Sequence, residues 1–151
     1  MTIIIDSREQ KPLVFGCDWV RKKLHVGDYG AKFSENHIHS TIFERKGISD
    51  LFSTLSTGYF RFRKEIDRAE KSKTRLIIAI EGTEERVLKG CSHSARDPKS
   101  ILVQLETINR KYGVSAIFFP SRIAMQNYIV DYYVIEYEKY LETIASLPEE
   151  L

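Results

Sequence analysis

Two acidic residues and a lysine are spaced so that one site could contain all three. Asp28 lies eight residues before Asn36, and Glu44 lies eight residues after it. If two strands pair antiparallel around a turn at Asn36 without a bulge, the two carboxylates face each other with Cβ atoms about 4.5–5.5 Å apart. Carboxylates this close repel each other, and a hard divalent cation such as Mg²⁺ would relieve the repulsion.

Lys46 extends this pattern to Asp-x15-Glu-x-Lys. Side chains alternate between the faces of a strand, so Lys46 shares a face with Glu44, and Arg45 points to the other face with a backbone carbonyl that could still complete a metal shell. Beside a bound cation, a lysine can orient the attacking water and neutralise charge on a phosphate. The pattern therefore favours metal-dependent phosphodiester hydrolysis. The alternative is a surface hairpin with a cross-strand Glu–Lys pair, because Glu-x-Lys alone is common.

The strands that would hold these residues are expected at 23–33 and 37–46, joined by a turn at 34–37. A β-branched run at 2–5 predicts a buried first strand that ends at Asp6. Apolar residues at helical spacing predict a short helix from Ile48 to Leu55 and a second helix over 59–71.

The rest of the chain alternates between strands and helices. The apolar segments 76–80 and 114–119 predict strands covered on both faces. Asp97 and Pro98 predict the start of a helix that stops at Gly113, and Ser121 predicts the cap of a long final helix. These elements indicate an α/β protein, a three-layer α/β/α fold with a central mixed sheet.

Composition limits the class of protein. With 42% hydrophobic and 29% charged residues in 151 positions, the chain is expected to form a single globular domain over 1–151. No apolar run reaches the ~20 residues of a membrane span, so no membrane association is expected. Two cysteines suit a reducing compartment, and we expect the cytoplasm, or the nucleus of a eukaryote. The formal net charge of +2 divides into −5 for residues 131–151 and +7 for the rest, which suits a polyanionic partner.

Other cofactors have little support in the sequence. The pairs His37-x-His39 and Cys91-x-His93 lack the four-ligand pattern of a zinc site. No Gly-x-x-x-x-Gly-Lys-Ser/Thr loop is present, so no nucleotide cofactor is expected.

Four motifs occur in order along the chain. They read Asp6-Ser7-Arg8-Glu9, Gly27-Asp28, Glu44-Arg45-Lys46 followed by Asp50, and Ile80-Glu81-Gly82. Over about residues 1–135, the chain resembles the nuclease domain of the XPF family of structure-specific endonucleases, which has a restriction-endonuclease-like fold. The resemblance implies a Mg²⁺- or Mn²⁺-dependent endonuclease that cleaves branched, flap or junction DNA. The tandem helix-hairpin-helix module of larger relatives has no counterpart in this sequence.

The resemblance also implies roles for individual residues. Asp28 and Glu44 would be the metal ligands and Lys46 the catalytic lysine. Arg45 and Asp50 belong to the same signature and would brace the site.

The first motif would approach the same site from the end of the first strand. Asp6 would belong to the catalytic group, Glu9 would serve a second cation, and Arg8 would face a phosphate. The alternative for Asp6 and Glu9 is a helix or turn cap near a strand end.

Basic residues on the predicted helix 59–71 could contact DNA. Arg61, Lys64 and Arg68 fall on one stripe of that helix with Lys71, and such a row could follow a DNA backbone. The alternative is a solvated helix face whose charges are balanced by Glu65 and Asp67.

Two further questions stay open at this stage. The final helix carries five tyrosines with apolar residues on more than one side, which core packing explains in large part, although a homodimer or a separate DNA-targeting partner would also fit. A non-catalytic DNA-binding or scaffold module, or a restriction or recombination nuclease, is the alternative to a branched-DNA endonuclease.

Overall fold

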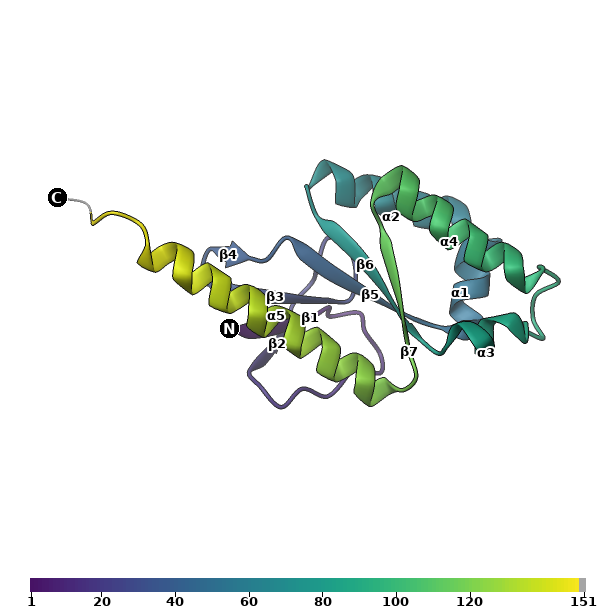
Figure 1. The fold of residues 1–151 in the computed structure, drawn as a ribbon, viewed down its shortest axis with the longest axis horizontal. Helices are drawn as coiled ribbons and strands as arrows, with labels where there is room; N and C mark the ends of the chain where they lie inside the picture. Colours follow the sequence, from purple (N-terminus) through teal and green to yellow (C-terminus); the bar gives the residue numbers. More distant parts are fainter. Residues whose placement is uncertain (150–151) are drawn as a thin grey trace.

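The computed structural model describes residues 1–149, which form a mixed β-sheet between two layers of helices (Figure 1). The sheet order is β2-β1-β3-β5-β6-β7, and β4 pairs with β3. β1 and β2 are parallel, β3 is antiparallel to both β1 and β5, and β5, β6 and β7 are parallel. The strands are β1 Thr2–Ile5, β2 Trp19–Arg21, β3 Tyr29–Ser34, β4 His37–Ile38, β5 Thr41–Gly47, β6 Arg75–Glu81 and β7 Ser115–Phe119.

The helices lie on both faces of this sheet, as the predicted α/β/α fold requires. The helices are α1 Ile48–Leu55, α2 Tyr59–Lys71, α3 Glu84–Leu88, α4 Pro98–Tyr112 and α5 Arg122–Ala145. One core cluster joins α1, α2 and α4 to alternate strand residues such as Ile42 and Ile78, and a second joins α5 to the intervening residues Phe43 and Ile77. Consecutive residues of β5 therefore face different helix layers, which confirms the predicted three-layer fold.

Local signals in the sequence set most helix ends. The Asp97 side chain accepts a hydrogen bond from the backbone N–H of Lys99, Pro98 begins α4, and Gly113 ends it in the left-handed conformation at φ 69°. The Ser121 hydroxyl accepts from the backbone N–H of Ala124 at the start of α5. The predicted bounds of α1 and α2 agree with the structure.

The predicted hairpin is less regular than expected. The strand predicted at 23–33 begins only at Tyr29, because the chain turns at Gly27, whose φ is 73°. The strand predicted at 37–46 divides into β4 and β5, and the pairing between β3 and β4 contains a register shift between Lys32 and Ser34.

Two elements were missing from the sequence expectation. β2 is a three-residue edge strand whose side chains are all exposed, so it has no alternation of apolar and polar residues to reveal it. α3 has only five residues, too few for a helical period. None of the helices within residues 1–149 has both the length and the apolar character to cross a bilayer.

Candidate active site

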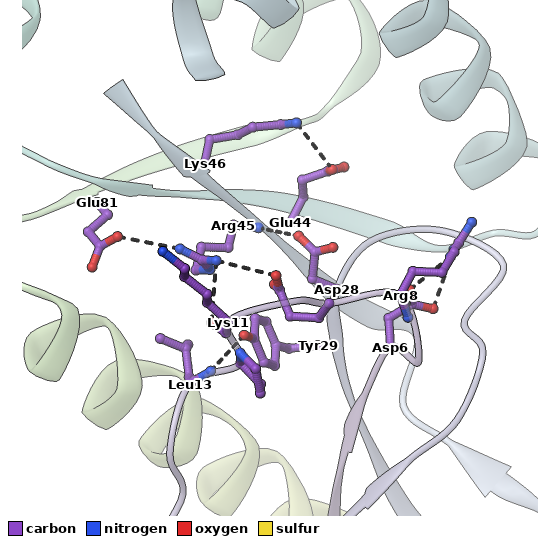
Figure 2. Close-up of polar contacts among 12 residues, drawn as sticks. Asp6, Arg8, Lys11, Leu13, Asp28, Tyr29, Glu44, Arg45, Lys46 and Glu81 are labelled. Carbon is purple, nitrogen blue, oxygen red and sulfur yellow. Dashed lines mark hydrogen bonds and ion pairs between the residues drawn. The ribbon is translucent and has the colours of Figure 1, made fainter. Parts of the chain in front are cut away.

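Asp28 and Glu44 lie close together where β3 begins, and their neighbours Tyr29 and Phe43 pair in the register that the sequence predicts. Tyr29 pairs with Phe43, and the backbone N–H of Asp28 donates to the carbonyl of Phe43 at 2.8 Å. Asp28 lies just outside β3, and its carboxyl group is close enough to Glu44 to raise the pKa of that carboxyl. The backbone N–H of Arg45 donates to Asp28 Oδ2 at 2.7 Å, which fixes the carboxylate beside β5 (Figure 2).

Lys46 lies on the same side of β5 as Glu44. Its Nζ is 3.6 Å from Glu44 Oε1 (Figure 2). The other oxygen of Glu44, Oε2, is buried and has no hydrogen-bond partner. A buried carboxylate oxygen without a donor is costly unless a ligand satisfies it. A divalent cation with oxygen ligands would satisfy it, so these residues fit the cation that the sequence pattern suggested.

The electrostatics of the two carboxyl groups agree with this fit. Burial raises the pKa of Asp28 to about 6; the charges of Glu9 and Glu65 raise it further, whereas the N–H of Arg45 and the charge of Lys46 lower it. Burial also raises the pKa of Glu44 well above its ordinary value, and contacts with Glu65 and Asp28 add to the rise. Both carboxyls therefore resist ionisation until a positive charge joins them.

The cation would keep much of its hydration in this arrangement. Within residues 1–149, no group of three or more His, Cys, Asp or Glu side chains is arranged to hold a metal ion directly. Mg²⁺ commonly binds proteins through one or two carboxylates and retains several waters. Two carboxylates beside a lysine are sufficient for such an open site.

Arg45 points to the other face of β5, as its position in the strand predicts. Its guanidinium is 3.3 Å from Glu9 Oε1 and 3.4 Å from Glu81 Oε2, and it also donates to the carbonyl of Lys11 (Figure 2). Glu9, expected to serve a second cation, is thus held in an ion pair with Arg45. Its charge is still close enough to Asp28 to raise the pKa of that carboxyl.

Asp6 and Arg8 form a brace at the end of β1. The backbone N–H of Asp6 donates to the carbonyl of Asp28, so the two residues are neighbours in the sheet. The buried Asp6 carboxylate accepts from Arg8 Nε at 2.9 Å and from the backbone N–H of Leu24 at 2.8 Å. Burial alone would raise the pKa of Asp6, but these hydrogen bonds outweigh it and lower the pKa. The contacts match the turn-cap interpretation of Asp6, and they occupy the guanidinium that was expected to face a phosphate.

Asp50 lies in the first turn of α1, directly after β5. The residue is exposed, and a negative charge at this position is favourable at a helix N-terminus. Its Oδ2 would lie 3.8 Å from a Cβ placed on Gly47, so the carboxylate sits over the residue that joins Lys46 to the helix.

The basic stripe of α2 lies beside Lys46. Arg61, Lys64 and Arg68 line a pocket of about 680 Å³ together with Lys46 and Glu65. The structure therefore brings the predicted DNA-binding residues and the predicted catalytic lysine to one surface.

Glu65 is the residue that sequence reasoning missed. From the sequence, Glu65 has a role only in the alternative of a solvated helix face, as a charge that balances the basic row. In the structure its Oε1 accepts a hydrogen bond from the backbone N–H of Gly27 at 3.1 Å, and its charge acts on both Asp28 and Glu44. The available signal was its place next to Ile66 on the apolar side of α2.

Comparisons with known proteins identify the family and the fold of the chain. A family model described as the ERCC4 domain matches residues 5–132. The structure of XPF from Aeropyrum pernix superposes with a TM-score of 0.68 at 21% identity, over 99% of this chain and 75% of that one. XPF from Aeropyrum pernix in complex with DNA gives a TM-score of 0.64 at 22% identity, over 98% of this chain and 68% of that one. No curated protein sequence matches the chain. The chain therefore belongs to the ERCC4 domain family, and its fold is that of the XPF nuclease domain.

Proposed function

We propose that this domain is a Mg²⁺- or Mn²⁺-dependent endonuclease that hydrolyses phosphodiester bonds in DNA. The observation that carries the proposal is the proximity of the Asp28 carboxyl to Glu44, whose buried Oε2 accepts no hydrogen bond from a donor, beside the amine of Lys46. Membership of the ERCC4 domain family supports nuclease chemistry. A solved XPF structure of the same fold is a complex with DNA, which supports DNA as the substrate.

Each residue at the site has a separate task in this proposal. Asp28 and Glu44 hold the cation, and the backbone N–H of Arg45 keeps Asp28 in position. A bound divalent cation would polarise the phosphate and make water a better nucleophile. Lys46 orients the attacking water and offsets the negative charge that develops on the phosphate.

The pocket beside Lys46 determines how DNA approaches. Arg61, Lys64 and Arg68 present three positive charges along α2 toward this pocket. Such a row suits the sugar-phosphate backbone, which sequence-independent nucleases contact. We propose branched, flap or junction DNA as the preferred substrate, with targeting assisted by a second copy of the chain or by a separate DNA-binding partner.

The test is cleavage of supercoiled plasmid with Mg²⁺ and with EDTA. We expect nicking only with the cation, and a loss of at least about a hundredfold in Asp28→Asn and in Lys46→Ala. Asp131→Asn on α5 and Lys111→Ala on α4 are matched controls, because both residues are exposed and lie outside the pocket.

The outcome separates the proposal from its alternatives. Undiminished cleavage by purified Asp28→Asn or Lys46→Ala would refute the assigned roles. DNA binding without any cleavage in Mg²⁺ or Mn²⁺ would identify a non-catalytic DNA-binding or scaffold module. Cleavage rates on flap, fork, four-way junction and linear duplex DNA would then establish the preferred substrate.

A further inference from the structure

A third carboxylate approaches Asp28 and Glu44 from a different element. Glu65 belongs to α2, and its side chain lines the same pocket as Lys46. Its Oε1 accepts a hydrogen bond from the backbone N–H of Gly27 at 3.1 Å. One oxygen of Glu65 is thus committed to the turn that precedes Asp28.

The turn at Gly27 needs such an anchor. Gly27 has a φ of 73°, and a Cβ at this position would lie 2.5 Å from Ile42 Cγ2 and 3.1 Å from the carbonyl oxygen of Phe43. The backbone therefore passes very close to β5 just before Asp28. Glu65 ties this turn to α2. It therefore helps to fix the position of the Asp28 backbone, from which the carboxylate extends.

The charges at this place are not balanced by the protein. After burial, a hydrogen bond between the carboxyl groups of Glu65 and Glu44 and the charges of Glu65 and Asp28 raise the pKa of Glu44, and Lys46 opposes them with its Nζ at 3.6 Å. Glu44 is only 7% exposed, and its Oε2 has no hydrogen-bond partner. Carboxylates gathered around a buried, unpartnered oxygen destabilise a fold, and a divalent cation would reverse the effect.

We propose that Glu65 is a positioning residue of the cation site. One of its oxygens holds the Gly27–Asp28 turn, and its negative charge joins those of Asp28 and Glu44 in holding Mg²⁺ or Mn²⁺, through the water that such a cation retains. This inference rests on the proposed metal-dependent function and adds a helix residue to a site otherwise formed by the sheet.

A purely structural role makes a different prediction. If Glu65 only anchors the turn, its replacement lowers stability and leaves the affinity for the cation unchanged. If its charge serves the cation, removal of that charge weakens cation binding and relieves repulsion in the metal-free protein. The two roles therefore differ in both readouts.

The experiment measures Mn²⁺ binding to the whole chain without DNA, by titration calorimetry or by the electron paramagnetic resonance of free Mn²⁺. In Glu65→Gln an amide oxygen can still accept from Gly27, but the charge is gone. We expect Mn²⁺ affinity to fall by at least about tenfold, which is the usual effect of residues that orient a metal shell. We also expect the metal-free unfolding midpoint to stay the same or rise.

Glu70→Gln is the matched control, because it removes the same charge from an exposed position on the same helix, away from the pocket. Its Mn²⁺ affinity should equal that of the unmodified protein. Unchanged affinity in Glu65→Gln would overturn the proposal. If Glu65→Gln lowers both affinity and stability, Glu65→Asp decides the matter, since it keeps the charge on a shorter side chain. Recovered affinity in Glu65→Asp supports the proposal, and affinity as weak as in Glu65→Gln overturns it.

Glu44→Gln separates this inference from the proposed function. Loss of Mn²⁺ binding and cleavage in Glu44→Gln, with normal binding in Glu65→Gln, would overturn only the role of Glu65. If the unmodified protein binds no Mn²⁺ and cleaves no DNA, the proposed function fails and the role of Glu65 fails with it.

Discussion

Charged side chains on the two faces of β5 differ in whether the protein itself supplies their partners. On one face, the charge of the Arg45 guanidinium is balanced by Glu9 and Glu81 at 3.3 and 3.4 Å, although its buried Nε has no hydrogen-bond partner. On the other face, Glu44 lies beside the carboxyl of Asp28 and keeps one buried oxygen without a partner. These adjacent residues show where the fold balances its own charges and where it leaves them for a ligand to balance.

Two buried tyrosine hydroxyls on the Arg45 face have hydrogen-bond partners within the protein. The buried hydroxyl of Tyr133 donates to the carbonyl of Thr41 at 2.6 Å. The hydroxyl of Tyr29 accepts from the backbone N–H of Leu13 at 2.8 Å, and burial raises the pKa of Tyr29 to about 12. A face whose polar groups have internal partners contributes to stability, whereas the unsatisfied face lowers stability and is suited to binding.

The largest expected difference is between substitutions of the adjacent basic residues Lys46 and Arg45, one affecting activity and the other affecting stability. We expect Lys46→Met to reduce DNA cleavage by at least about a hundredfold with little loss of stability. Arg45→Met should lower the free energy of unfolding by about 2–4 kcal/mol, because it leaves Glu9 and Glu81 without their partner in a site from which water is largely excluded. Urea unfolding and plasmid nicking measure the two effects.

The side chains removed are similar in length, so each variant controls for the other. The comparison of the two faces would be wrong if Lys46→Met destabilised the protein as much as Arg45→Met. It would also be wrong if Arg45→Met left the urea midpoint unchanged.

Short-range rules were sufficient to predict one part of the site. The equal spacing of Asp28 and Glu44 around Asn36 predicted an unbulged hairpin; the structure shows a bulge near Ser34, but the neighbouring pair Tyr29–Phe43 has the predicted register. Strand alternation placed Lys46 on the face of Glu44. Both rules depend on strand geometry alone, which is why they held.

The remaining contacts depend on how separate elements pack. The hydrogen bond from Gly27 to Glu65 joins residues 38 positions apart, and it exists only because α2 lies against this edge of the site. The pair of Arg45 with Glu9 spans 36 positions. Periodicity identifies the apolar side of a helix but does not determine what the residues beside it will meet, so neither contact could be predicted from the sequence.

The unbalanced face should also give the metal-free protein an unusual pH dependence. Because the pKa of Asp28 is raised to about 6 and that of Glu44 is raised well above its ordinary value, the folded state favours their protonated forms. Protonation of these two carboxyls stabilises the folded state. This contribution is fully present below the ordinary carboxyl pKa, and for Asp28 it is lost as the pH rises through about 6. We expect the urea midpoint without metal to fall from pH 5 to pH 7, and Mn²⁺ to restore it at pH 7.

Asp28→Asn provides the control for this pH dependence. Burial lowers the pKa of His39, which gives an opposite slope in the same range, but that slope is common to both proteins and cancels in the comparison. The metal-free midpoint of Asp28→Asn should fall less between pH 5 and pH 7 than that of the unmodified protein. If the urea midpoints of the two proteins changed equally with pH, the pH dependence would not come from Asp28.

The smallest expected effect concerns the basic residues beside the unbalanced face. Arg61→Gln and Lys64→Gln should each weaken DNA binding a few-fold and reduce the slope of log affinity against log salt by about 1, because each removes one phosphate contact. Lys139→Gln removes a charge from α5, on the other side of the sheet, where the lysine is paired with Glu136. If DNA contacts only the side of Lys46, this control keeps the original salt slope. A slope that falls equally in all three variants would mean that binding reflects the overall charge of the protein and that the two faces do not differ toward DNA.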